Sequence, residues 1–267
     1  MPDTLATAAT ANHYRVTAKA DAAAVGATAL TFRTAAAGTV MGTAVGVFKL
    51  DVFHRLSRIA CAREISEHHP DRPSSLSGEE WYAKNQARYY PMRNAFEDNW
   101  ADGRRAVYFA LLLDGPAPPS YGEYTLVVDP SRLHDLDLAC FPGNTAERYA
   151  PSGTLELDLC LSEISPWDLR GDLLTIKHAA LLSGDAKEWP AMVCGETEFS
   201  EAVAVGALPL SAIAEIRVKK LHYRRWQALR LRRLNGLDLS DEEASQVEML
   251  DLLCHWRDLF GTRIVGV

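Results

Sequence analysis

The sequence lacks the signatures of several protein classes. Its five cysteines are scattered, odd in number and never spaced as Cys-x-x-Cys, which argues against a disulfide framework and a zinc site. No apolar run approaches the roughly 18 residues that cross a bilayer, and the N-terminus has neither the basic start nor the hydrophobic centre of a secretion signal. We therefore expect a soluble cytoplasmic protein with reduced thiols, no metal and no membrane partner.

The chain also lacks a phosphate loop and an overall basic charge. The glycines of GTVMGTAVG at 38–46 are not followed by Lys-Ser/Thr, so a flexible connection is predicted there instead. The net charge of -7 argues against wholesale capture of nucleic acid, but it conceals the basic run RVKKLHYRRWQALRLRR at 217–233. A surface for single strands combines such charge with aromatic rings, here Arg224, Arg225 and Trp226. A solvated helix face explains the same residues equally well.

The 267 residues, 48% of them hydrophobic, are enough for one large domain with appendages. The pattern of apolar runs predicts an α/β (α+β) fold with a mixed central sheet and flanking helices. We expect an N-terminal arm or hairpin over 1–46, the sheet domain over 47–220 and a C-terminal helical pair over 221–267. The expected hairpin depends on alternation of apolar and polar residues at 13–17 and 29–33.

Within this outline the sequence predicts individual elements from periodicity, capping residues and turn residues. An apolar strand begins at Val47 and passes into a helix at His54 and Arg55. A helix capped by Ser77 and interrupted by Pro91 runs over 78–99. The other expectations are paired strands at 105–113 and 124–128, an irregular segment at 140–149, a strand or short helix at 155–161, a helix at 166–182, strands at 202–205 and 213–218, and helices at 221–234 and 240–260, the last with a Ser240–Glu243 capping box.

Three carboxylates, Glu196, Glu198 and Glu201, lie at the mouth of the apolar strand 202–205. Acid groups at the end of a buried strand are costly to desolvate, so a chain that keeps them there can use them to hold a cation or to steer a proton. The alternative is that two of the three are solvated loop charges.

Two groups of cationic residues are candidates for binding an anionic or nucleotide ligand. His54 and Arg55, near a predicted strand end, can hold a diphosphate or a ribose hydroxyl through their donors. Arg88 and Arg93 flank Pro91 and, with tyrosines such as Tyr90, can stack on a base or grip a phosphate. The alternatives are a helix-start histidine with a surface arginine, and aromatic rings that belong to the core.

Several segments, taken in order, resemble the DarT-like ADP-ribosyltransferases, a mixed α/β family that transfers ADP-ribose from NAD onto a base in single-stranded DNA. The similarity covers about residues 47–219. It rests on VFHRLSRIACAREI at 52–65, YYPMRNAF at 89–96, RAVYFALLL at 105–113, CFPGNTA at 140–146 and FSEAVAVGALPLSAIAEIRV at 199–218.

The resemblance implies an ADP-ribosyltransferase, of toxin or phage-defence type, that uses NAD as a substrate and a nucleic-acid base as acceptor. Glu201 and Arg93 would be catalytic, and an antitoxin or immunity protein would be a candidate partner. His54 and Arg55 would bind NAD, and Tyr108 or Phe109 would pack against the nicotinamide. The expected substrate-binding residues are Arg88, Tyr90, Glu198, Arg224, Arg225 and Trp226.

Two other functions stay open at this point. The chain can be a non-enzymatic module that binds nucleic acid or a partner through 217–233, or a hydrolase that consumes NAD with Glu196, Glu198 or Glu201 as its base. The sequence leaves the oligomeric state open as well. The transferase hypothesis requires Glu201 to share one hollow with His54 and an arginine from the first half of the chain.

Overall fold

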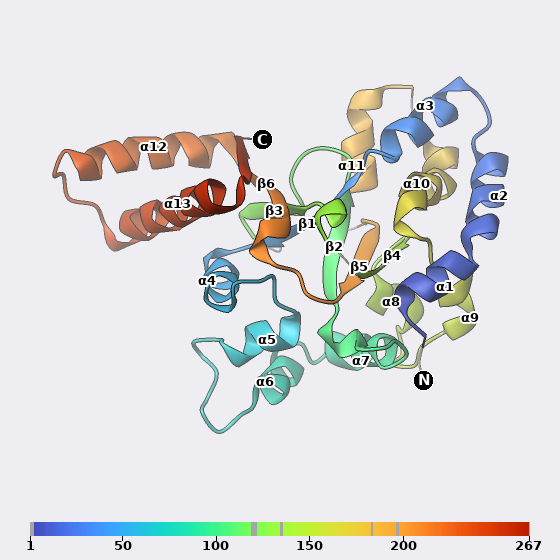
Figure 1. Ribbon diagram of the computed structural model, residues 1–267, viewed down its shortest axis with the longest axis horizontal. Helices are drawn as coiled ribbons and strands as arrows, with labels where there is room; N and C mark the ends of the chain where they lie inside the picture. The colour runs from blue at the N-terminus through green and yellow to red at the C-terminus, as the bar shows by residue number, and fades with distance from the viewer. Residues whose placement is uncertain (1–2, 119–121, 134–135, 183, 196–197, 267) are drawn as a thin grey trace.

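The fold is built on one mixed seven-stranded sheet with helices around it (Figure 1). The computed structural model describes residues 1–267 except 1–2, 119–121, 134–135, 183, 196–197 and 267. The strand order is β4-β5-β2-β1-β3-β6-β7, and β6 and β7 are parallel while the other neighbours are antiparallel. The strands are β1 (Val40–Val45), β2 (Val107–Leu112), β3 (Tyr124–Val128), β4 (Asp137–Phe141), β5 (Glu201–Val205), β6 (Ile213–Val218) and β7 (Arg263–Gly266). The predicted α+β class is confirmed.

Helices precede, interrupt and follow the strands. They are α1 (Leu5–Ala11), α2 (His13–Ala23), α3 (Ala27–Ala36), α4 (Val47–Leu56), α5 (Ala62–Glu67), α6 (Gly78–Asn85), α7 (Tyr89–Glu97), α8 (Thr145–Tyr149), α9 (Leu157–Glu163), α10 (Arg170–His178), α11 (Trp189–Val193), α12 (Lys220–Leu234) and α13 (Asp241–Phe260). Helix α10 packs against α2 and α3, and α12 packs against α13. The α12–α13 pair extends to one side of the molecule, opposite α1, α2 and α3 (Figure 1).

The predicted N-terminal hairpin is wrong, because both of its expected strands lie in helices, α2 and α3. This region is rich in alanine, which has the highest helix propensity, and Ala29, Phe32 and Ala36 bury one helical face. Arg33 of α3 donates from Nε to Oδ1 of Asp172 in α10 over 2.6 Å, which ties the N-terminal helices to the rest of the fold.

The glycine-rich segment predicted to be a flexible connection is β1, in the middle of the sheet. A Cβ at Gly42 would lie 2.3 Å from Cδ1 of Leu112, so a larger residue at this position would force the Leu112 side chain to move. Because β1 lies between β2 and β3, those two strands do not pair with each other, and the expected pairing of 105–113 with 124–128 is wrong. A boundary at residue 46 would cut β1 out of the sheet.

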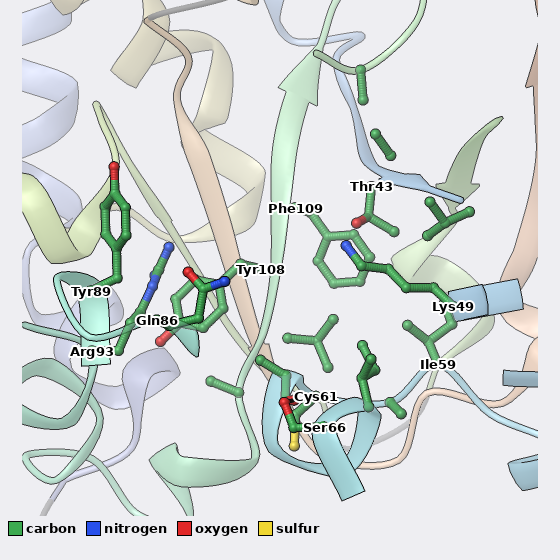
Figure 2. Close-up of a pocket in the computed structure, with 18 of the residues that line it drawn as sticks. Thr43, Lys49, Ile59, Cys61, Ser66, Gln86, Tyr89, Arg93, Tyr108 and Phe109 are labelled. Atoms are coloured by element: carbon green, nitrogen blue, oxygen red, sulfur yellow. Dashed lines mark hydrogen bonds between the residues drawn. The ribbon is translucent and has the colours of Figure 1, made fainter. Parts of the chain in front are cut away.

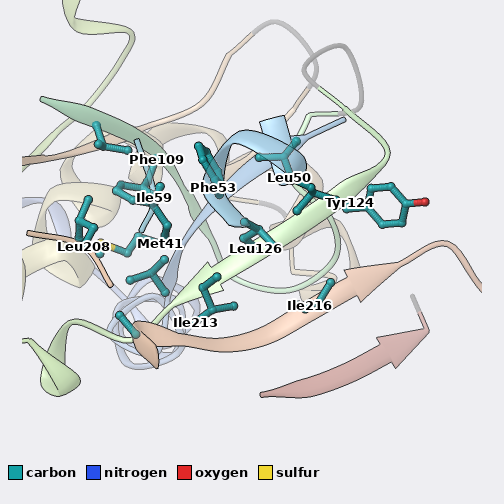
Figure 3. Close-up of a cluster of buried hydrophobic side chains, with 14 of the residues drawn as sticks. Met41, Leu50, Phe53, Ile59, Phe109, Tyr124, Leu126, Leu208, Ile213 and Ile216 are labelled. Atoms are coloured by element: carbon teal, nitrogen blue, oxygen red, sulfur yellow. The ribbon is translucent and has the colours of Figure 1, made fainter. Parts of the chain in front are cut away.

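The strand predicted from Val47 is also wrong, because 47–56 is helix α4. Its buried residues Leu50 and Phe53 are three apart, a helical spacing, and they pack on β1, β2, β3 and β6 in the main core (Figure 3). Ser57, at φ 55°, ends the helix in the left-handed conformation.

The remaining predictions are mostly confirmed. Ser77 caps α6 and the Ser240 capping box of α13 forms, and strands β2, β5 and β6 and helices α12 and α13 fall where expected. The predicted helix 78–99 is interrupted between α6 and α7 rather than at Pro91, which lies in the first turn of α7 where its missing N–H costs no helical hydrogen bond. The segment 140–149 is more regular than predicted, since β4 ends at Phe141 and α8 begins at Thr145.

His178, at the end of α10, should make the fold sensitive to acid. It is 4% exposed, and its Nε2 has no hydrogen-bond partner among the described residues. Burial, with the charge of Lys177 adding to it, lowers the pKa of His178 from 6.5 to about 4. Between pH 6.5 and about 4, His178 is protonated in the unfolded chain but neutral in the folded chain. Acidification over this range therefore lowers the free energy of unfolding by at most about 3 kcal/mol.

Urea unfolding at a series of pH values tests this expectation. The free energy of unfolding of a His178→Phe variant should fall less steeply than that of the natural chain as the pH drops from 6.5 to 4. Other titrating groups act on both proteins alike. Parallel curves over that interval would contradict the expected role of His178.

Candidate functional site

The candidate site is a cavity of about 680 Å³ between the sheet and helices α4 to α7 (Figure 2). Strands β1 and β2 supply Gly42 to Val45 and Val107 to Ala110, and the helices and their connections supply mainly apolar and aromatic side chains. This volume is within the range of roughly 300 to 1,000 Å³ that is usual for small-molecule sites. Glu201 is the only carboxylate among the described residues that line the cavity.

Glu201 is the first residue of β5, and its side chain is only 3% exposed. Its Oε2 accepts hydrogen bonds from the backbone N and the Oγ1 of Thr145, over 2.7 and 2.9 Å. Its Oε1 accepts from Nη2 of Arg93 over 3.3 Å. A carboxylate survives burial when such donors replace water, so Glu201 is held in one orientation at the cavity wall.

Arg93 of α7 contacts Glu201 and also Thr145 and Tyr108. Its Nη1 donates to Oγ1 of Thr145 over 3.0 Å, and its guanidinium carbon lies 3.7 Å from the centroid of the Tyr108 ring. Burial lowers the pKa of Arg93, but the charge of Glu201 and the interactions with Tyr108 and Tyr82 together more than offset this, so the pKa lies above its usual value. The guanidinium is therefore a permanent cation beside the carboxylate.

Tyr108, which contacts Arg93, is held by a second buried carboxylate, that of Glu97. Tyr108 Oη donates to Oε1 of Glu97 over 2.8 Å, and Arg63 forms an ion pair with the other oxygen of Glu97. Burial, together with the charge of Glu97, raises the pKa of Tyr108, so this phenol stays neutral. The result is a connected series Glu97–Tyr108–Arg93–Glu201 across α7, β2 and β5.

The structure brings together four of the predicted site residues. Glu201, Arg93, Tyr108 and Phe109 all line the cavity, and Figure 2 shows Arg93 beside Tyr108, with Phe109 on the other side of β2 in this view. Sequence reasoning missed Thr145 and Glu97. A signal existed for Glu97, since it lies four residues after Arg93 and so on the same face of α7.

His54 and Arg55 do not lie in this hollow, so that prediction is wrong. His54 is exposed, and its Nδ1 accepts from Nε1 of Trp256 in α13 over 3.3 Å. Arg55 forms an ion pair with Asp51, one turn earlier in α4, over 2.8 Å. The error follows from the strand that was predicted to begin at Val47. This segment is helix α4, which turns the side chains of His54 and Arg55 away from the sheet.

Arg88 and Tyr90 do not line the cavity either. Arg88 is exposed and donates to Glu147 over 3.3 Å, while Tyr90 Oη donates to Glu79 over 2.7 Å. Tyr89 lines the cavity together with Arg93, four residues later. Side chains four apart share a helix face, which explains why the immediate neighbours of Tyr89 point elsewhere.

The other predicted residues also lie outside the cavity. Glu198 is exposed, and Glu196 lies outside the described residues. Arg224 and Arg225 are exposed on α12, but Trp226 is 4% exposed and packs against Tyr223 with ring centroids 5.3 Å apart. A base therefore has no access to the Trp226 ring, and the predicted stacking on it is wrong.

The described residues show no metal site and no membrane-spanning helix, and the sequence matches no protein-family model and no curated protein. In the part of the chain that the structure describes, His, Cys, Asp and Glu side chains form no group of three or more suited to a metal ion. No described helix combines the length and apolar composition that crossing a membrane requires. Searches against protein-family models and curated proteins found no match to this chain. The resemblance to DarT-like ADP-ribosyltransferases therefore stays a prediction.

Proposed function

We propose that this protein is an ADP-ribosyltransferase that transfers ADP-ribose from NAD to a nucleic-acid base. One observation carries the proposal. The buried carboxylate of Glu201 is held by Thr145 and Arg93 in the wall of a cavity large enough for a nucleotide. Buried, oriented charged groups in a cleft are typical of reaction centres, and the closing segment of the sequence resemblance contains the same glutamate.

The position of Glu201 suits cleavage of a glycosidic bond. Oε2 accepts two hydrogen bonds of normal length from Thr145, whereas Oε1 accepts one longer bond from Arg93. Oε1 is thus the oxygen with capacity for a further donor, such as a ribose hydroxyl. As the bond between C1′ and nicotinamide breaks, positive charge develops on the ribose, and a fixed carboxylate stabilises that charge.

The reaction balances without an added oxidant or reductant. Nicotinamide leaves with the electron pair of the broken bond, and a base nitrogen of the acceptor forms the new bond to C1′. The proton of that nitrogen passes to Glu201 or to solvent. Phe109 is only 1% exposed, so its ring offers little surface to a ligand. The partly exposed rings of Phe48, Trp81 and Tyr89 along the cavity instead offer flat apolar surface to nicotinamide and adenine.

Adenylate-labelled NAD tests the proposal directly. The full chain is incubated with this NAD and, separately, with single-stranded DNA, double-stranded DNA, RNA and protein. Label on a nucleic acid together with free nicotinamide supports the proposed transfer. Release of free ADP-ribose with no labelled acceptor supports the hydrolase instead. Intact NAD in every mixture rejects both enzymes.

One surface favours nucleic acid as the binding partner. Lys219, Lys220, Arg224 and Arg225 are exposed around the start of α12, and none has an ion-pair partner among the described residues. By contrast, the arginines near the end of α12 pair with carboxylates of α13. The start of α12 is therefore free to contact phosphates, either for the transferase or for a non-enzymatic module.

Replacing both Arg224 and Arg225 with glutamine should weaken binding of single-stranded DNA and lower its salt dependence. Two lost phosphate contacts reduce the slope of log K against log salt by about 1.4. Fluorescence anisotropy over a range of salt concentrations measures this slope. Arg230→Gln is the matched control, because Arg230 is paired with Asp251 over 3.5 Å. Equal slopes in the natural chain and the double variant would remove α12 from the DNA-binding surface.

A further inference from the structure

A second cation lies in the cavity, and none of the groups described above accounts for it. Lys49, in the first turn of α4, lines the cavity and is half-buried. Figure 2 shows its side chain extending toward Thr43 of β1, near Phe109, while Arg93 and Tyr89 lie on the other side of β2 in this view. Among the described residues, nothing forms an ion pair or a hydrogen bond with its ammonium group.

A half-buried ammonium group without a counterion is costly. Burial lowers the pKa of Lys49, which reflects the loss of water around the charge. The carboxylate that lines the cavity, Glu201, is already held by Arg93 and Thr145. The other titratable side chains along the cavity wall are His69, Cys61 and tyrosines, and these supply no anion at neutral pH. An anionic ligand would therefore meet an unmatched positive charge.

The start of α4 adds to this charge. The helix has ten residues, and its N-cap Gly46 provides no side-chain hydrogen bond to the first turn. The N-terminal end of a helix carries a partial positive charge, which favours a nearby anion. Val45, Phe48 and Lys49 all line the cavity, so this end of the helix borders it.

We propose that Lys49 and the first turn of α4 form an anion subsite that binds the diphosphate of a dinucleotide. The identity of the ligand rests on the proposed function, whereas the anion site itself rests on the unmatched charge. A dinucleotide places two ribose–base units on either side of a diphosphate. One unit then reaches Glu201 and Arg93, and Lys49 takes the role that the sequence assigned to Arg55, which lies outside the cavity.

Titration calorimetry with ADP and with adenosine tests the subsite on the full chain. ADP should bind more tightly than adenosine, and Lys49→Gln should weaken ADP binding roughly 10-fold to 100-fold, as expected for a lost hydrogen bond to a charged group. The same substitution should leave adenosine binding unchanged. Lys49→Arg should retain most of the affinity, because it keeps the positive charge.

Three controls separate this inference from misfolding and from the transferase proposal. Lys187→Gln removes an exposed lysine of the same charge and should bind ADP as the natural chain does. Glu198→Gln should also retain ADP affinity, because Glu198 is exposed and lies outside the cavity. Thermal melting curves establish that each variant is folded.

The outcomes are distinguishable. ADP binding that depends on Lys49 without any turnover of NAD supports the subsite and rejects the transferase. Turnover of NAD with the same KM in Lys49→Gln supports the transferase and rejects the subsite. ADP binding no tighter than adenosine binding, or equally tight in Lys49→Gln, overturns the subsite whatever the turnover. Absence of any nucleotide binding or turnover rejects both.

Discussion

Replacing Glu201 with glutamine is expected to slow ADP-ribose transfer about 100-fold to 10,000-fold, the usual contribution of a group that stabilises charge or moves a proton. Glutamine has nearly the same shape, and its amide oxygen can still accept the two hydrogen bonds of Thr145. It carries no charge, so it stabilises the developing positive charge on the ribose far less. Single-turnover rates at saturating NAD measure this difference without a contribution from product release.

The chain offers a close control for this substitution. Glu198 precedes Glu201 by three residues, is exposed and does not line the cavity. Glu198→Gln should transfer ADP-ribose at the rate of the natural chain. Equal rates in Glu201→Gln and the natural chain would reject Glu201 as the catalytic carboxylate. A slow Glu198→Gln variant would instead assign a role in turnover to the loop before β5.

The elements that the sequence predicts correctly are those whose signals are local. Strand β2 is a long apolar run, and α6 and α13 begin with capping boxes at Ser77 and Ser240. Strand β1 gives no such signal, since its glycine and small residues form a strand only because β2 and β3 pair with it on both edges. The pairing partner of a strand depends on the whole sheet, so the expected pairing of β2 with β3 could not be corrected from local patterns.

The difference between local and long-range signals also explains which site residues the sequence predicts. Glu201 and Arg93 are 108 residues apart, and their meeting follows from the packing of α7 near the start of β5. Sequence resemblance proposed both residues, and the structure places them together. Lys49 lies outside every segment of the resemblance, and Thr145 lies within CFPGNTA but was not predicted as a site residue, so only the structure identifies them. His54 was misplaced because the helical spacing of Leu50 and Phe53 was interpreted as a strand.

Replacing Arg93 with methionine should destabilise the fold by about 3 to 5 kcal/mol, because it leaves the Glu201 carboxylate buried without its cation. Methionine retains much of the apolar contact of the arginine side chain with Tyr108, so the loss is mainly electrostatic. Urea unfolding measures the change. Arg88→Met, an exposed residue near the start of the same helix, should change the stability by less than about 0.5 kcal/mol.

The double variant Arg93→Met/Glu201→Gln separates a structural from a functional role for the pair. With no carboxylate left to compensate, it should be more stable than Arg93→Met alone, since the glutamine still accepts from Thr145. Additive losses of stability would mean that the two charges are not coupled. A buried ion pair often contributes no more stability than uncharged groups in its place, so the fold alone does not require this one. A stable double variant without transfer activity would then show that the pair is retained for chemistry.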